Sequence, residues 1–187
     1  MLVILLIAIN VVVFVIPYVI NFGGRYGNSF LNFVSLGWKS NPQIADGELY
    51  RLLTSNFLHG SVTHLVLNML ALYNLGFSVL RVYGGNNLLF ILTYIFSSIC
   101  GSIFSFIFNP QNPSLGASGA IMGLIGSLMS YAIIYRNGAL FQDIVINLVI
   151  IGVIGVTVSR IDNFGHIGGF LCGFVMYFVL HYLNFIS

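Results

Sequence analysis

The chain has 187 residues, with six Lys and Arg, four Asp and Glu, and a formal net charge of +2 at pH 7. Charged residues make up 5% of it, against about 25% in an ordinary soluble domain, and 58% of the residues are hydrophobic. This composition excludes a soluble globular protein, a disordered chain and a disulfide-stabilised secreted domain, and the small net charge excludes nucleic-acid binding. It predicts a single all-α, polytopic membrane domain over residues 1–187.

Six stretches are long and apolar enough to cross the hydrocarbon core of a bilayer, which takes about 20 apolar residues in a helix. They cover residues 2–20, 62–80, 88–108, 115–135, 139–158 and 164–186. The first stretch lacks a basic n-region and an A-x-A-like cleavage site, so we expect a retained helix rather than a signal peptide. The pattern predicts six transmembrane helices.

Residues 21–61 form the one long connection, and this loop is rich in aromatic residues. Trp and Tyr concentrate at the membrane–water interface, so we expect the loop to lie along the membrane surface. Gly23, Gly24 and the Asn41-Pro42 pair argue against one continuous helix there.

Polar residues occur near the starts of the second, fourth and sixth stretches. Successive spans alternate in direction, so these three starts face one side of the membrane and both termini face the other. His64 and Asn68 lie four residues apart, on one face of the second helix. Ser118 lies near the start of the fourth stretch and His166 near the start of the sixth. Polar side chains in a membrane are costly and mark functional sites, so we expect these four to converge.

Glycines predict close packing of the fourth and sixth helices, because small residues at regular spacing let two backbones approach in lipid. The glycines are Gly119, Gly123 and Gly126, and Gly165, Gly169 and Gly173. Such packing brings Ser118 within reach of His166, and a serine beside an imidazole is the minimum for nucleophilic catalysis. The Ser118 backbone N–H and the side chains of His64 and Asn68 are candidate donors to an oxyanion.

Each of these residues also has a purely structural interpretation. Ser118 fits a glycine-rich packing face, and His64 and Asn68 fit hydrogen bonds between helices. Asp162, four residues before His166, fits either a solvated loop or a third member that orients the imidazole.

Metal and disulfide chemistry are not expected. A metal site needs three or four ligands, and no Cys or carboxylate is well placed beside His59, His64 and His166. Cys100 and Cys172 lie inside apolar runs, where packing in the membrane is the simpler interpretation.

Three motifs stand in order at the starts of the second, fourth and sixth stretches. They are His64-x-x-x-Asn68, Gly116-Ala117-Ser118-Gly119-Ala120 and Gly165-His166-x-x-Gly169-x-x-x-Gly173. They resemble the second-helix motif, the G-x-S-G motif and the sixth-helix histidine motif of the rhomboid family of intramembrane serine proteases. Residues 47–54 and 57–60 resemble the end of that family's first loop.

The resemblance implies a six-helix core with Ser118 as nucleophile, His166 as general base and no acidic third member. The Ser118 N–H, His64 and Asn68 would hold the oxyanion. It implies hydrolysis of peptide bonds in or beside transmembrane segments of other membrane proteins, within the lipid bilayer and without metal or cofactor. The active site would open into a water-filled cavity below the membrane surface, with the fifth helix as a gate.

The resemblance also implies a multi-pass protein of the bacterial plasma membrane whose active site opens to the extracytoplasmic side. The positive-inside rule favours the opposite orientation, because four of the six basic residues lie on the expected active side. Those four are Arg25, Lys39, Arg51 and Arg160; the other two are Arg81 and Arg136. Since Arg51 matches a family position, we expect the family's orientation.

Two positions depart from the family pattern. Tyr50 stands where many members have Trp, and Met122 stands where many have an aromatic that stacks on the histidine. The alternative function is a catalytically silent rhomboid-like chaperone or scaffold, but such relatives usually lose the serine or the histidine, and this chain keeps both. A transporter would favour internal repeats and midplane ionisable residues, and neither pattern is evident in the sequence.

Overall fold

The computed structural model describes residues 1–20, 29–157 and 161–186. Its long helices are α1 (Leu2–Val19), α5 (Val62–Val82), α6 (Asn87–Phe108), α7 (Ser118–Ile134), α8 (Gly138–Thr157) and α9 (Asn163–Tyr182). Each lies in one of the six apolar stretches, with its ends within four residues of those expected. The part of the chain that is described contains no β-strand, only an isolated bridge between Lys39 and Ser114, so the all-α prediction is confirmed.

The helix α7 is shorter than a full membrane span. The other five long helices are apolar and long enough to cross a membrane, whereas α7 has 17 residues and is about 26 Å long at 1.5 Å per residue. It begins at Ser118 and not at the expected residue 115. It contacts α5, α6, α8 and α9, and every residue from 119 to 130 is buried. Because protein rather than lipid surrounds α7, it does not have to match the bilayer thickness; six full spans stay a prediction.

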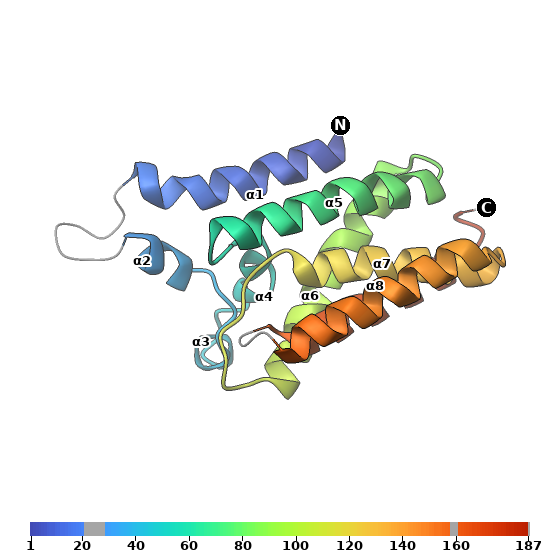
Figure 1. Cartoon of the computed structure of the whole chain (residues 1–187). Helices are drawn as coiled ribbons and strands as arrows, with labels where there is room; N and C mark the ends of the chain where they lie inside the picture. Colours follow the sequence, from blue (N-terminus) through green and yellow to red (C-terminus); the bar gives the residue numbers. More distant parts are fainter. Residues whose placement is uncertain (21–28, 158–160, 187) are drawn as a thin grey trace.

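The long helices lie roughly side by side except α6, which crosses the others obliquely, and the connections collect at two ends (Figure 1). Both termini lie at one end, with the α5–α6 and α7–α8 turns. The other end holds the short helices between α1 and α5, the loop before α7 and the start of α9. This arrangement agrees with the alternation expected from the sequence.

The connection between α1 and α5 is broken into short pieces. It contains α2 (Ser29–Ser35), α3 (Asn41–Ala45), α4 (Arg51–Thr54) and the 3-10 turn η2 (Ser55–Phe57). The expected absence of a single long helix holds for the described part, in which Pro42 lies in the first turn of α3, a position that proline favours. Gly23 and Gly24 lie outside the described residues, and placement of this loop along the membrane surface stays a prediction.

Local capping fixes where two of the site-bearing helices begin. The Ser61 hydroxyl accepts a hydrogen bond from the His64 N–H at 3.1 Å and caps α5. The Asp162 carboxylate accepts one from the Gly165 N–H at 3.0 Å and caps α9. Such caps satisfy N–H groups that have no partner within the helix, and they set the first turns of α5 and α9 at the same end as Ser118.

Candidate active site

Ser118 and His166 are in direct contact. Ser118 is the first residue of α7, and His166 lies in the first turn of α9. The Ser118 Oγ and the His166 Nε2 are 2.9 Å apart, a normal hydrogen-bond distance. The His166 Nδ1 is buried and has no hydrogen-bond partner within the described ranges. The structure thus brings the predicted nucleophile and base together, with no carboxylate hydrogen-bonded to the far side of the imidazole in that part of the chain.

The contact depends on close approach of the α7 and α9 backbones. A Cβ added at Gly169 would overlap the Gly119 carbonyl, and one added at Gly173 would overlap the Gly123 carbonyl. A larger residue at either position would therefore push the helices apart. The predicted packing of the two glycine faces is confirmed, and it explains how two short side chains on different helices can meet.

Gly116, in the loop before α7, lies against two side chains of α5. Its φ is +124°, in the left-handed region that favours glycine, and its N–H donates to the Ser55 carbonyl at 2.9 Å. A Cβ at Gly116 would lie 2.8 Å from the His64 Nε2 and 3.6 Å from the Asn68 Nδ2. Both side chains of the α5 motif therefore reach the loop two residues before Ser118.

Asn68 carries an unused hydrogen-bond donor at this place. The residue is buried, and its Nδ2 has no hydrogen-bond partner among the residues that the structure describes. Leaving a buried donor unpaired costs about 1–3 kcal/mol, so such groups are uncommon unless a ligand completes them. The four predicted site residues, His64, Asn68, Ser118 and His166, thus lie around one loop.

His59 is a neighbour of the site that the sequence indicated as a nominal metal ligand and as part of the first-loop motif over residues 57–60. It is 1% exposed, and its ring packs edge-to-face against His64 with centroids 5.1 Å apart. Burial, followed by the nearby His64, lowers the pKa of His59 to about 3, so the ring is neutral at physiological pH. Its burial depends on the fold of the preceding loop, which a local motif does not reveal.

A small polar cavity opens beside the dyad. It has a volume of about 30 Å³ and lies against both Ser118 and His166. A water needs about 10–15 Å³ on this measure and two or more polar partners, so the cavity has room for about two. Its other polar walls come from Ser55, Asn56, Ser102, Ser114 and Asp162.

Asp162 is neither a residue of a solvated loop nor a hydrogen-bonded third member of the dyad, the two roles that its sequence position suggested. It is half-buried, and its carboxylate caps α9 by accepting from the Gly165 N–H; it also accepts from the Asn109 Nδ2 at 3.4 Å. Burial raises the pKa of Asp162, but hydrogen bonds, chiefly from Ser105 and Ser114, lower it by more and leave the pKa below its usual value. The side chain is therefore an ionised helix cap in the cavity wall.

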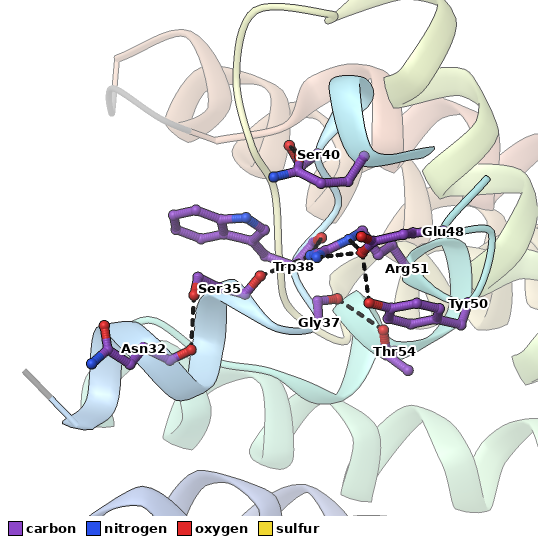
Figure 2. A network of polar contacts seen from close by, with 10 residues as sticks. Asn32, Ser35, Gly37, Trp38, Ser40, Glu48, Tyr50, Arg51 and Thr54 are labelled. Atoms are coloured by element: carbon purple, nitrogen blue, oxygen red, sulfur yellow. Dashed lines mark hydrogen bonds and ion pairs between the residues drawn. The ribbon is translucent and has the colours of Figure 1, made fainter. Parts of the chain in front are cut away.

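The first loop is anchored by Arg51, which is 5% exposed. Its guanidinium forms an ion pair with Glu48 at 2.6 Å and donates to the carbonyls of Ser35 at 2.8 Å and Trp38 at 3.1 Å (Figure 2). Tyr50, the replacement for the family's Trp, donates its hydroxyl to Glu48 at 2.6 Å, and the Arg51 guanidinium lies 5.4 Å from the centre of its ring. Hydrogen bonds from Tyr50 and then Arg51 lower the pKa of Glu48.

Over the described ranges, no cluster of three or more His, Cys, Asp or Glu is arranged to hold a metal ion. Cys100 and Cys172 are free cysteines. Met122 is buried in the core around α7. The groups that the fold brings together at the site are a serine, an imidazole and nearby N–H donors.

Comparison with known proteins finds relatives in the same family that the sequence motifs resemble. Rhomboid protease GluP of Bacillus subtilis (strain 168) is 46% identical over 145 residues, which is 75% of this chain and 28% of that protein. RHOMBOID-like protein 4 of Arabidopsis thaliana is 38% identical over 164 residues, which is 82% of this chain and 40% of that protein. Rhomboid-like protease 3 of Toxoplasma gondii is 31% identical over 144 residues, which is 74% of this chain and 54% of that protein.

The matched region thus spans between 28% and 54% of the length of these three relatives. A family model, described as the Rhomboid domain, matches residues 46–183. This region contains the α5, α7 and α9 motifs and most of the chain. The chain therefore belongs to the rhomboid family and is an all-α, multi-pass membrane protein.

Proposed function

We propose that the protein is an intramembrane serine protease that hydrolyses peptide bonds in or beside transmembrane segments of other membrane proteins. The observation that carries the proposal is the 2.9 Å contact between the Ser118 Oγ and the His166 Nε2, in a family whose relatives in Bacillus subtilis and Toxoplasma gondii are named proteases. The intact dyad argues against a silent chaperone or scaffold. The mechanism requires no metal or cofactor.

In the proposed reaction, the His166 Nε2 takes the proton from the Ser118 hydroxyl as its oxygen attacks the scissile carbonyl carbon. The resulting imidazolium then gives this proton to the leaving amine, and an acyl ester remains on Ser118. A water molecule, deprotonated by His166, attacks the ester carbonyl carbon. The bond to the Ser118 oxygen then breaks, the imidazolium returns the proton to that oxygen, and the acid is released. The polar cavity beside the dyad provides a place for that water in a protein surrounded by lipid.

Negative charge on the carbonyl oxygen needs donors placed in advance. The first N–H groups of a helix have no partner within the helix and carry its positive dipole end, which suits the Ser118 N–H to this role. The unpaired Asn68 Nδ2 and the His64 ring approach the same loop from α5. We assign these three groups to the oxyanion site.

Access for a transmembrane substrate is proposed to lie between α5 and α8. Only 11% of the residues in the apolar window Gly138–Gly155 of α8 are buried. The helix packs on α7, and over the described residues its contact with α5 is sparse. Near its C-terminal end α8 is tied to the start of α9, because the Asn163 Nδ2 donates to the Gly155 carbonyl at 2.8 Å. The proposed opening therefore depends on the sparse contact between α5 and α8.

Linking α5 to α8 is expected to slow cleavage of membrane substrates, because the substrate must pass between these helices. The measurement uses cysteine pairs at exposed positions, such as Leu67 or Leu70 with Ile146 or Val149, joined by a bifunctional reagent after Cys100 and Cys172 are replaced. A pair linking α1 to α5, which already pack together, is the control and should leave turnover unchanged. Unchanged turnover in a verified α5–α8 crosslinked sample would remove α8 from the gating role.

We further propose that the dyad end faces the extracytoplasmic side of a bacterial plasma membrane. Lys39 and Arg51, two of the basic residues that opposed this orientation, are both buried. Lys39 donates to the Asn109 carbonyl in the loop before α7 and Arg51 to the Ser35 carbonyl in the first loop, so the fold itself accounts for their position. A cysteine at the exposed Asn112 should react with an impermeant maleimide on intact cells, and one at the exposed Asn137 should not. The reverse pattern would contradict this orientation.

The proposed activity is tested with the full chain reconstituted in liposomes and a single-span substrate. Cleavage in or beside the span, mapped by mass spectrometry of both fragments, is the expected result. The matched substrate carries the same sequence outside the span but an unrelated span. Absence of cleavage across a panel of such substrates, by protein shown to be folded, would count against the proposal.

A further inference from the structure

Asp162 holds the turn of backbone from which the catalytic imidazole projects. Its carboxylate accepts from the Gly165 N–H at 3.0 Å, and its backbone carbonyl accepts from the His166 N–H at 3.1 Å. The peptide N–H groups of His166 and of the residue before it are therefore both bonded to this one residue. A change in the position of Asp162 would move the base relative to Ser118.

The position of Asp162 is itself fixed through the loop before α7. The Asn109 side chain donates to the Asp162 carboxylate at 3.4 Å, and the Asn109 carbonyl accepts from the Lys39 Nζ at 2.9 Å. Lys39 is fully buried, and its Nζ also donates to the Asn112 carbonyl at 3.2 Å. Its main chain pairs in both directions with Ser114, at 2.9 and 3.1 Å. The first loop, the loop before α7 and the start of α9 are thus joined at one point.

The negative charge of Asp162 partly compensates the buried charge of Lys39. A buried charge is costly unless it is paired. Burial lowers the pKa of Lys39, and the negative charge of Asp162 opposes that effect. Burial raises the pKa of Asp162, but hydrogen bonds, chiefly from Ser105 and Ser114, lower it by more and keep the carboxylate ionised close to the dyad.

The carboxylate also lies close to the reacting groups. Of the four acidic residues in the chain, Asp162 alone lies in the wall of the cavity that Ser118 and His166 share. It is four residues before His166 and makes no hydrogen bond to its ring in the described residues. In a serine protease triad, one acid both orients the imidazole and stabilises the imidazolium through a hydrogen bond to Nδ1; the His166 Nδ1 has no such partner in the described residues.

We infer that Asp162 is a positioning residue for His166 that performs both tasks indirectly. Its cap on α9 orients the imidazole, and its negative charge, acting across the turn, stabilises the imidazolium that forms when Ser118 attacks. The inference rests on the proposed protease function. It differs from the dyad description because it makes the rate depend on a carboxylate that touches neither the imidazole nitrogens nor the substrate.

Two substitutions of Asp162 distinguish the effect of its helix cap from the effect of its charge. Asp162→Asn keeps an oxygen that can cap the helix, since Asn and Asp cap about equally well, but removes the charge. Asp162→Ala removes both. The matched control is Asn86→Ala, which removes a helix cap at the end of the molecule away from the dyad. The Asn86 side chain caps α6 by accepting from the Leu88 and Leu89 N–H groups at 3.0 and 3.2 Å. Full-length variants are reconstituted in liposomes, and kcat, KM and the thermal transition are measured on each.

Asp162→Asn is expected to lower kcat about tenfold, the effect of weakening a charge interaction by roughly one pKa unit, with KM and the thermal transition unchanged. Asp162→Ala should lower kcat at least as much and should also lower the thermal transition. Asn86→Ala should lower the thermal transition and leave kcat unchanged.

Wild-type kcat in Asp162→Asn would overturn the inference, because it would leave Asp162 only a structural cap. The inference would also fail if Asp162→Asn lost kcat only together with thermal stability, or if Asn86→Ala lost kcat to the same extent. An inactive wild-type protein, or an active Ser118→Ala protein, would instead contradict the proposed function itself.

Discussion

Replacing Ser118 or His166 by Ala is expected to lower the cleavage rate of a transmembrane substrate by about 10⁴-fold or more, to the background level. Losing either the nucleophile or its base removes the covalent pathway, and such losses typically cost several orders of magnitude. Thermal stability should change little, because the Ser118 side chain caps no helix and bonds only to His166 in the described structure.

The chain offers a matched control for each dyad variant. Ser78→Ala removes a hydroxyl that bonds within exposed α5, to the Asn74 carbonyl at 3.0 Å. His181→Ala removes an imidazole at the other end of the molecule, 3.4 Å from the Tyr135 hydroxyl. Both controls should cleave at the wild-type rate. Robust cleavage by purified Ser118→Ala protein, with no wild-type contamination, would refute the mechanism.

The second large effect is expected for Asn68→Ala, which should lower kcat by about 10²–10³-fold with KM little altered. Charge develops on the carbonyl oxygen only as the transition state forms, so a donor placed there stabilises that state more than the bound substrate. The buried, unpaired Nδ2 of Asn68 has no other partner to lose in the described residues. The effect should be smaller than that of Ser118→Ala, since nucleophile and base remain.

The control for this prediction is Asn74→Ala on the same helix, where the Asn74 Nδ2 only donates to the Leu70 carbonyl at 3.0 Å on the exposed side. It should leave kcat unchanged. If Asn68→Ala loses thermal stability and rate together, Asn68 acts by holding helices together. If both are normal, the oxyanion must rely on His64 and the Ser118 N–H.

Local and periodic patterns made much of this site predictable from the sequence. The spacing of His64 and Asn68 sets them on one face of α5, and the glycine spacing of α7 and α9 predicts the close approach that places Ser118 against His166. Ser61 before α5 is a normal capping residue, and it caps in the structure. These features need only helix geometry and the alternation of spans.

Features that depend on contacts between distant segments were not predictable in this way. α7 begins at Ser118 and not three residues earlier, because the Lys39–Ser114 bridge and the Gly116–Ser55 hydrogen bond hold the preceding loop extended. The burial of Lys39 follows from the same loop packing. Asp162 caps α9 and lies in the wall of the cavity, a place that depends on the loop before α7, which hydropathy alone does not position.

The most direct test of the central claim is to treat the reconstituted protein with a serine-reactive fluorophosphonate and to locate the adduct by mass spectrometry. The account predicts one adduct, on the Ser118 oxygen, formed by the wild type, strongly reduced in His166→Ala and absent in Ser118→Ala. Every other serine whose side chain the structure describes lacks an imidazole partner there, so these serines should remain unmodified. An adduct on another serine, or equal labelling of wild type and Ser118→Ala, would contradict a catalytic role for the Ser118–His166 pair.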